Sequence, residues 1–333
     1  MQSTAALVLI TSCFYSLLTT HVLAAEEDPG FRLWLDSLRQ EALGAGISQP
    51  VLDSALGNLT EPLPRVLELD RKQPESTQSL ADYLASRVSD KRIANGRSML
   101  SEYPTWLGRV ESENGVARRI IVALWGIESN YGRNTGGFGV VPALATLAYD
   151  GRRGEYFRKE LLEALRILDA GHIPLEQMNG SWAGAMGQCQ FMPSSFRRFA
   201  VGGNGDGRKD IWTSVPDVLA STANYLNQAG WQQGQTWGRP VRLPKKFETS
   251  RIGLDTRLPL SRWQTLGVRQ INGSALPGRS LQASLIRPDG PGTQAYLVYD
   301  NFRVILAWNK STAFAVAVGT LSDRLATKTG KGR

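Results

Sequence analysis

The chain has little cysteine and little histidine, and both shortages exclude classes of chemistry. Its 333 residues include two cysteines, Cys13 and Cys189, and two histidines, His21 and His172. Because zinc sites are built from clusters of these residues, a Cys-based zinc site and a metalloprotease-type His pair are excluded. A serine triad would depend on His172 alone once a leader containing His21 is removed. The remaining proton-transfer chemistry relies on carboxylates.

The N-terminus lacks charge. Residues 5–24 carry no charged side chain, are mostly apolar and end in Val22-Leu23-Ala24 before an acidic segment. This pattern predicts a signal peptide over residues 1–24 and an exported, periplasmic protein, although no Lys or Arg precedes the apolar stretch and a membrane anchor is the alternative. Residues 10–13, Ile-Thr-Ser-Cys, resemble a lipobox, so an outer-membrane lipoprotein anchored through Cys13 is a second alternative. After cleavage at residue 24, Cys189 is the remaining cysteine and no internal disulfide is expected.

A concentrated basic tract is also missing. The net charge is +8 and the pI is about 9.6, with the basic residues spread along the chain. This balance favours a polyanionic partner or surface. No RNP, zinc-finger or basic-helix pattern is present, and export argues against nucleic acid, so we expect no nucleic-acid partner.

An apolar run that ends in a carboxylate stands near the middle of the chain. Residues 120–132 read IIVALWGIESNYG. The polar residues before this run predict a helix that enters at about Asn114 and stops at Gly132, with Glu128 on its last turn. Burial and the negative end of a helix both raise the pKa of a carboxyl. Glu128 is therefore a candidate general acid; the alternative is a Glu that reaches solvent at a helix end or pairs with an Arg.

A second unusual stretch, residues 180–195, reads GSWAGAMGQCQFMPSS. Its small residues allow a close backbone approach. Ser181 and Gln190 offer hydrogen bonds, and Phe191 offers an apolar face. This mixture suits sugar rings, which have polar edges and apolar faces. A tightly packed helix–loop junction is the alternative.

Residues 202–212, GGNGDGRKDIW, partly match a calcium-binding loop. Asn204 and Asp206 fit the pattern, and Asp217 is a further candidate oxygen ligand. Gly202 stands where the first carboxylate is expected, and two basic residues follow. We therefore favour a plain turn over a tight calcium site.

Helical spacing covers most of the mature chain and lapses in one region. Between residues 238 and 293, short apolar pieces separated by Pro and Gly predict a β-rich insertion. Helices are expected over 31–45, from 48, 79–88, 89–93, 114–128, 142–148, 158–169, 216–228, 296–308 and 312–325, and a connection is expected over 58–76. The predicted organisation is a signal peptide (1–24), an N-terminal helical subdomain (25–115), a catalytic core (116–237), the insertion (238–293), C-terminal helices completing the core (294–327) and a basic tail (328–333).

Four motifs together resemble the B-type family of lytic murein transglycosylases, which cleave bacterial peptidoglycan. They are Ile-Glu-Ser-Asn-Tyr-Gly at 127–132, the stretch at 180–195, Gly-Asp-Gly…Trp at 205–212, and Trp-Asn-Lys-Ser…Phe-Ala-Val-Ala-Val at 308–318. The resemblance extends over residues 31–325. It implies a mainly α fold, with a lysozyme-like helical core, an N-terminal helical subdomain and a small β-rich insertion.

The resemblance also implies a mechanism with one carboxyl. Glu128 would protonate the glycosidic oxygen between N-acetylmuramic acid and N-acetylglucosamine. It would then accept the proton of the C6 hydroxyl as a 1,6-anhydromuramic end forms. No water is consumed and no cofactor is required. The implied partners are glycan strands and other cell-wall enzymes, and a monomer is expected.

Several positions fall where the family lines its saccharide cleft: Tyr83, Tyr156, Ser181, Gln190, Phe191, Tyr225, Trp308, Asn309 and Phe314. Trp308 and Phe314 stand in place of tyrosines, which keeps stacking surface and removes hydroxyl hydrogen bonds. Arg152 and Arg153 are candidates to meet peptide-stem carboxylates, or else form a solvated helix start.

Two other functions remain open for this sequence. A muramidase on the same scaffold would use water, and a murein-binding protein would not cut at all. Cys189 is expected to be a small packed residue, because no histidine is placed to activate it.

Overall fold

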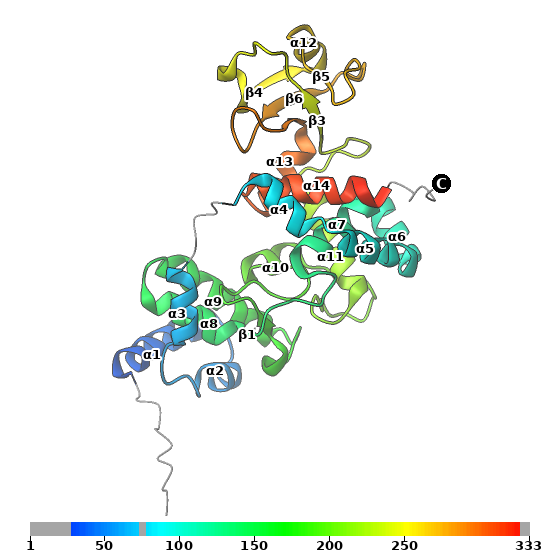
Figure 1. Ribbon diagram of the computed structural model, residues 1–333. Helices are drawn as coiled ribbons and strands as arrows, with labels where there is room; N and C mark the ends of the chain where they lie inside the picture. Colours follow the sequence, from blue (N-terminus) through cyan, green and yellow to red (C-terminus); the bar gives the residue numbers. More distant parts are fainter. Residues whose placement is uncertain (1–27, 73–77, 327–333) are drawn as a thin grey trace, which may run out of the picture.

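The structure is a computed structural model that describes residues 28–72 and 78–326. The predicted signal peptide, with Cys13 and His21, and the basic tail lie outside the described residues. Figure 1 shows a helical body at the N-terminal side, a second helical body around α7, and a β-sheet at the opposite end.

The N-terminal helices pack on two later helices. They are α1 (Pro29–Gly44), α2 (Gln49–Leu56) and α3 (Pro64–Arg71), and they contact α8 (Val140–Asp150) and α9 (Gly154–Asp169). The α1 helix begins where the Asp28 side chain accepts a hydrogen bond from Phe31 N at 3.0 Å, as an N-cap should. The connection expected over 58–76 is wrong in part, because α3 begins within it at Pro64. A proline in the first turn leaves no donor unpaired, so Leu63-Pro64 starts a helix here.

The second body surrounds one buried helix, α7 (Arg118–Ser129). Around it lie α4 (Leu80–Arg87), α5 (Asp90–Glu102), α6 (Pro104–Asn114), α11 (Val215–Gln228) and α14 (Thr312–Ala326). The helix expected to enter at Asn114 begins four residues later. Asn114 ends α6 instead, and Gly115 turns the chain with a φ of 68°. The sequence reading missed α6 and ended α5 too early, at Ile93.

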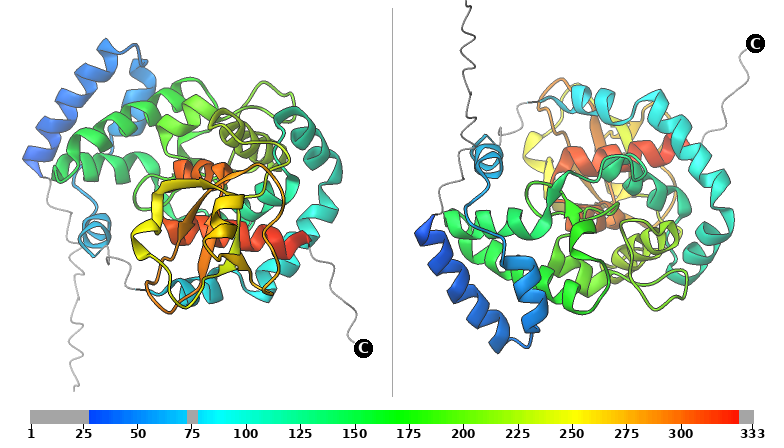
Figure 2. Two further views of the ribbon diagram at one scale, coloured as in Figure 1. Left: turned by 90° about the horizontal axis from the view of Figure 1, so that it is seen from above. Right: turned by 90° about the horizontal axis from the view of Figure 1, so that it is seen from below.

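The β-rich insertion is a five-stranded antiparallel sheet in the order β4-β6-β7-β3-β5. Its strands are β3 (Gly238–Arg242), β4 (Gly253–Pro259), β5 (Arg269–Gln270), β6 (Gln282–Ile286) and β7 (Ala295–Val298), with α12 (Leu260–Thr265) closing one end. The first view in Figure 2 shows the sheet lying over α13 (Asp300–Trp308) and α14. The helix expected from Tyr296 is wrong for its first residues. Tyr296 lies in β7, between β3 and β6, so the sheet passes the expected end of the insertion at 293. A short apolar run is compatible with a strand or a helix, and this run forms a strand because it pairs with β3 on one side and β6 on the other.

Short elements complete the fold. They are β1 (Phe138–Gly139) paired with β2 (Asn179–Gly180), α10 (Pro193–Phe199), and the 3-10 turns η1 (Leu175–Gln177) and η2 (Thr249–Arg251). Among the described residues, no single helix is both long and apolar enough to cross a membrane. The α13–α14 pair meets that criterion in length and composition, with a bend of 117° between its helices.

Candidate active site

Glu128 lies on the last turn of α7 and is fixed there by an unusual turn. The residues that follow, Asn130 and Tyr131, both have positive φ, at 51° and 61°. A positive φ is uncommon for residues other than glycine. It folds Tyr131 back over Gly126, where a Cβ would lie 2.6 Å from the tyrosine hydroxyl. The helix therefore ends at Ser129 with Asn130 as its C-cap, two residues before the expected stop at Gly132.

The surroundings of Glu128 favour its protonated form. Burial raises the pKa of its carboxyl from 4.5 to about 7, and a hydrogen bond from Trp308 and the charge of Arg87 oppose this rise. The Trp308 Nε1–H donates to Glu128 Oε1 at 2.6 Å. Because an indole N–H can only donate, Oε1 is an acceptor and Oε2 is left to hold the proton. At neutral pH this carboxyl can both give and take a proton.

Trp308 belongs to an aromatic group beside Glu128. Its ring centroid lies 5.1 Å from that of Phe191 and 4.6 Å from that of Tyr225. The Tyr225 hydroxyl donates to Ala307 O at 2.8 Å, which fixes the chain just before Trp308. The expected loss of a tyrosine hydroxyl at position 308 is therefore offset, since the indole N–H supplies a hydrogen bond to the carboxyl.

Helix α4 brings Tyr83 and Arg87 to the same carboxyl. Burial and the charge of Glu128 raise the pKa of Tyr83. The Arg87 guanidinium lies 5.5 Å from the centre of the Tyr83 ring. Sequence reasoning missed Arg87, and its spacing of four residues from Tyr83 was the available signal. The β-rich insertion (the β domain) holds the start of α4, because both carboxylate oxygens of Asp289 accept a hydrogen bond from Leu80 N, at 2.8 and 3.0 Å.

The stretch at 180–195 forms a tight loop beside the site. Ser181 Oγ accepts from Ala185 N at 3.0 Å. Gln190 has a φ of 51°, and its Nε2 donates to Thr135 O and Gly187 O at 2.9 and 2.8 Å. The loop is tightly packed, as the second alternative expected, and contact of Ser181 and Gln190 with a sugar stays a prediction.

Gln188 is a positioning residue that the sequence did not reveal. Its Oε1 accepts from the Trp125 indole on α7 at 2.9 Å, and its Nε2 donates to Trp212 O at 2.8 Å. The side chain therefore ties α7 to the loop at 202–212. No charge or periodicity marked this glutamine, because its role depends on contacts with distant segments.

The remaining predicted cleft residues differ in exposure. Tyr156, on α9, is 46 % exposed and can meet a ligand. Asn309 is exposed, and its Oδ1 accepts from Ser311 N at 3.0 Å. Phe191 and Phe314 are 2 % and 4 % exposed, so they support the site from within the core and offer no stacking face.

Cys189 is buried, and burial raises the pKa of its thiol to about 12. Its Sγ lies 3.6 Å from both Val218 O and Thr222 Oγ1. An un-ionised, enclosed thiol is a poor nucleophile, which agrees with the prediction of a packed residue.

Comparison with known proteins decides the family. Residues 30–323 match the family model described as a transglycosylase SLT domain. This chain belongs to the SLT transglycosylase family.

Relatives of this SLT transglycosylase include both curated proteins and solved structures. The chain is 36 % identical over 253 residues to the membrane-bound lytic murein transglycosylase B of Escherichia coli K12, covering 73 % of this chain and 66 % of that protein. The match therefore spans slightly under two thirds of that relative's length. The crystal structure of SltB3 from Pseudomonas aeruginosa, in complex with NAG-anhNAM-pentapeptide, is 46 % identical with a TM-score of 0.87, covering 90 % of this chain and 80 % of that one.

A third relative is the E. coli lytic transglycosylase Slt35 in complex with calcium, at 31 % identity and a TM-score of 0.75, covering 90 % of this chain and 93 % of that one. The family resemblance and the mainly α fold expected from the sequence are confirmed by these matches.

The calcium-loop residues of this SLT transglycosylase bond to the protein itself. Buried Asp217 accepts from Gly203 N at 2.8 Å, Asn204 N at 3.3 Å and Asp210 N at 2.7 Å. Asn204 Oδ1 accepts from Asp206 N at 3.0 Å. Within the described ranges, no group of three or more His, Cys, Asp or Glu is placed to hold a metal. Calcium takes six to eight oxygen ligands, which include Asn and backbone carbonyls, and the expectation of a plain turn at 202–212 stays a prediction.

Arg152 and Arg153 meet a carboxylate of the protein itself. Arg152 Nε donates to Asp70 Oδ2 at 2.7 Å and Arg153 Nη2 donates to Asp70 Oδ1 at 2.9 Å. Asp70 is buried, and these hydrogen bonds hold its pKa below the usual range. The pair ties the turn between α8 and α9 to α3. Contact of these arginines with peptide stems stays a prediction.

Proposed function

We propose that this protein is a lytic transglycosylase of peptidoglycan. It cleaves the β-1,4 bond between N-acetylmuramic acid and N-acetylglucosamine and leaves a 1,6-anhydromuramic end. The observation that supports this most is a carboxyl, Glu128, with a pKa near 7 and one oxygen held by Trp308. The relatives named as lytic transglycosylases, one with an anhydro product fragment bound, agree with this reading.

The reaction uses Glu128 twice. Its Oε2 proton passes to the glycosidic oxygen as the bond to the muramyl C1 breaks, and the departing sugar leaves as an alcohol. The carboxylate formed is stabilised by the Trp308 N–H and by the nearby charge of Arg87. It then removes the proton of the muramyl C6 hydroxyl, whose oxygen bonds to C1. Glu128 regains its proton, so each cycle is complete without water.

A muramidase on the same scaffold is the second candidate. Ordinary glycosidases place a second carboxylate beside the first, to act as nucleophile or as base. Among the described residues, the side chains that shift the Glu128 pKa are Trp308 and Arg87, and neither is a carboxylate. This arrangement favours a reaction in which the substrate supplies its own nucleophile.

Mass spectrometry of products from purified sacculi tests the proposal. We expect the wild type to release muropeptides lighter by one water than hydrolytic products, and Glu128→Gln to release them at a rate lower by roughly two orders of magnitude or more. Glu61→Gln is the matched control, because Glu61 is exposed and lies outside the site. Hydrated products would identify a muramidase. The absence of products from a folded wild type would favour a non-catalytic murein-binding protein.

We further propose that the chain acts outside the cytoplasm, since peptidoglycan lies there, and that residues 1–24 direct its export. Cell fractionation of the wild type and a Cys13→Ala variant distinguishes the two export routes. A soluble periplasmic protein in both cases supports cleavage after Ala24. Release from the outer membrane only in Cys13→Ala would establish a lipid anchor.

A further inference from the structure

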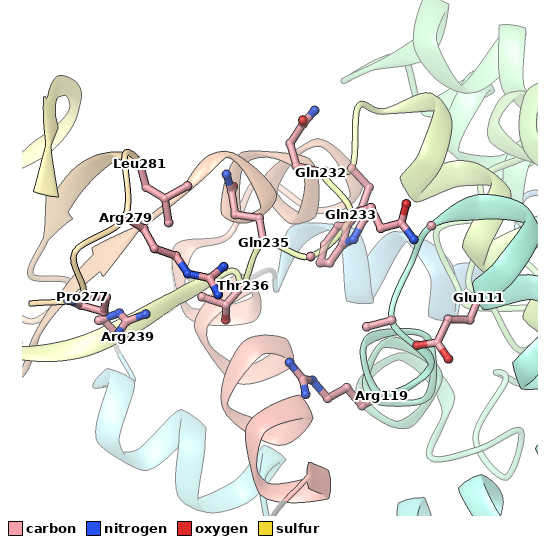
Figure 3. Close-up of a pocket in the computed structure, with 14 residues that line it drawn as sticks. Glu111, Arg119, Gln232, Gln233, Gln235, Thr236, Arg239, Pro277, Arg279 and Leu281 are labelled. Carbon is pink, nitrogen blue, oxygen red and sulfur yellow. The ribbon is translucent and has the colours of Figure 1, made fainter.

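A cavity of about 810 Å³ lies at the end of α7 opposite to Glu128. It is open on one side and is lined by the start of α7, by the segment at 231–236 that leads into β3, and by the loop at 277–281 of the β-rich insertion. Figure 3 shows side chains from all three segments turned toward this space. Its volume lies within the range of roughly 300–1,000 Å³ that is usual for ligand sites.

Three guanidinium groups from two bodies of the protein line the cavity. Arg119 comes from α7, and Arg239 and Arg279 come from the β domain. Arg239 Nε donates to the Tyr299 hydroxyl at 2.8 Å, which fixes the side chain at the cavity. Arg279 is exposed and forms no ion pair with any described residue within 4.0 Å.

Acidic groups near the cavity do not balance this charge. Glu111 is engaged by Arg118, at 2.7 Å. Asp323 accepts from the Trp237 indole at 3.0 Å and lies within electrostatic reach of Arg119 and Arg239. Glu111 lines the cavity but is paired with Arg118, and Asp323 is within reach of two of the three arginines, so the cavity keeps a positive field that attracts anions.

Two buried polar atoms at the same cavity lack hydrogen-bond partners among the described residues. They are Arg119 Nε, a donor, and Gln235 Oε1, an acceptor. Buried polar atoms are nearly always paired. A donor and an acceptor left unpaired beside one polar cavity indicate that a polar ligand or its bound water completes the site.

We propose that this cavity binds the carboxylates of a peptide stem of peptidoglycan, at a site separate from the cleavage site. The inference rests on the proposed function, because that substrate carries peptides with free carboxylates. Arginine matches a planar carboxylate through two parallel N–H donors. Arg119 and Glu128 are nine residues apart on α7, about 14 Å along its axis, so the cavity is distinct from the cleavage site.

Binding of the free pentapeptide, measured by NMR, tests the site directly. Trp231 lines the cavity, and its indole N–H signal can be assigned with Trp231→Phe. We expect the pentapeptide without sugars to shift this signal in Glu128→Gln protein, which cannot turn substrate over. Arg279→Gln should raise the dissociation constant for the pentapeptide about tenfold, because one charge-assisted contact is lost.

Arg262→Gln is the matched control, because Arg262 is an exposed arginine of the same domain outside the cavity. Equal weakening in both variants would show a nonspecific charge effect and overturn the proposal. A Trp231 shift with inorganic phosphate but none with the pentapeptide would assign the cavity to another oxyanion and overturn it as well. Failure of the proposed function has a different signature, namely hydrated or absent products in mass spectrometry.

Discussion

The two ends of helix α7 carry charges of the sign that a helix disfavours. Its N-terminal turn holds Arg118 and Arg119, although the helix dipole places partial positive charge there. Its C-terminal turn holds Glu128, although partial negative charge gathers at that end. Acidic residues in the first turn and basic residues in the last turn would stabilise a helix, and α7 has the reverse arrangement.

The consequence differs between the ends because the groups differ. A carboxyl can avoid an unfavourable charge by keeping its proton, and burial raises the pKa of Glu128 to about 7. An arginine stays charged at any ordinary pH, so the charge of Arg119 needs an external partner or the nearby Asp323. The same helix thus carries a carboxyl that can hold a proton at one end and lines the proposed anion-binding cavity at the other.

The largest expected effect separates the two ends by activity. Glu128→Gln should lower the rate of release from sacculi by roughly 10²–10⁴-fold, the usual contribution of a general acid–base group. Pentapeptide binding at the Arg119 cavity should not change. The rate follows from a dye-release assay, with Glu61→Gln as the control. A loss of less than threefold would contradict the role of Glu128.

The next effect concerns stability and pH. The pKa of Glu128 rises from 4.5 in the unfolded chain to about 7 in the folded protein. The folded state therefore binds this proton more tightly, so the contribution of Glu128 to stability is complete below pH 4.5 and is lost as pH rises through 7. The loss amounts to about 3 kcal/mol, at 1.36 kcal/mol per pKa unit.

Urea unfolding of the wild type and Glu128→Gln across this pH range measures the effect. The glutamine variant lacks the titration, so its stability relative to the wild type should increase with pH. A constant difference between the two proteins would show that the carboxyl is not perturbed.

A smaller effect is expected from removal of the hydrogen bond between Trp308 and Glu128, at the C-terminal end of α7. Trp308→Phe removes the donor to Glu128 Oε1, so the carboxylate loses stabilisation and its pKa rises further. The alkaline limb of the pH–rate profile should move upward by about one pH unit. Trp308→Tyr restores a hydroxyl donor and should return the limb toward the wild-type position. An unchanged limb in Trp308→Phe would exclude this contact from the mechanism.

The smallest effect expected is that of calcium on stability, which shows whether protein groups alone hold the loop at 202–217. Because Asp217 bonds to three backbone N–H groups, calcium should add no stability. Differential scanning calorimetry with calcium and with a chelator should give melting temperatures within about 1 °C, since a ligand that does not bind shifts no equilibrium. A rise of several degrees with calcium would contradict the geometry described for the 202–217 loop.

Sequence reasoning predicted the parts that depend on local pattern. The apolar run before Glu128 and the Pro- and Gly-rich texture after residue 238 identified the core helix and the β domain. The α3 and α6 helices were missed, because Pro64 and Pro104 are helix starters that also occur in connections. The strand at 295–298 was taken for helix, because only pairing with β3 and β6 distinguishes them.

The site was predicted less completely than the fold. Glu128 could be recognised from its apolar approach. The hydrogen bond from Trp308 and the bridge made by Gln188 could not, because both join residues far apart in the chain. Arg87 likewise reaches Glu128 only through the packing of α4.

The hydrogen bond between Trp308 and Glu128 joins residues 180 positions apart in the chain. Tyr83 and Arg87 approach from the other direction, on a helix whose start depends on Asp289. A nascent chain that ends before position 308 therefore has its acid without the partners that tune it. An enzyme that cuts the cell wall would thus acquire its activity at the end of its own synthesis and folding, when almost the whole polypeptide has emerged.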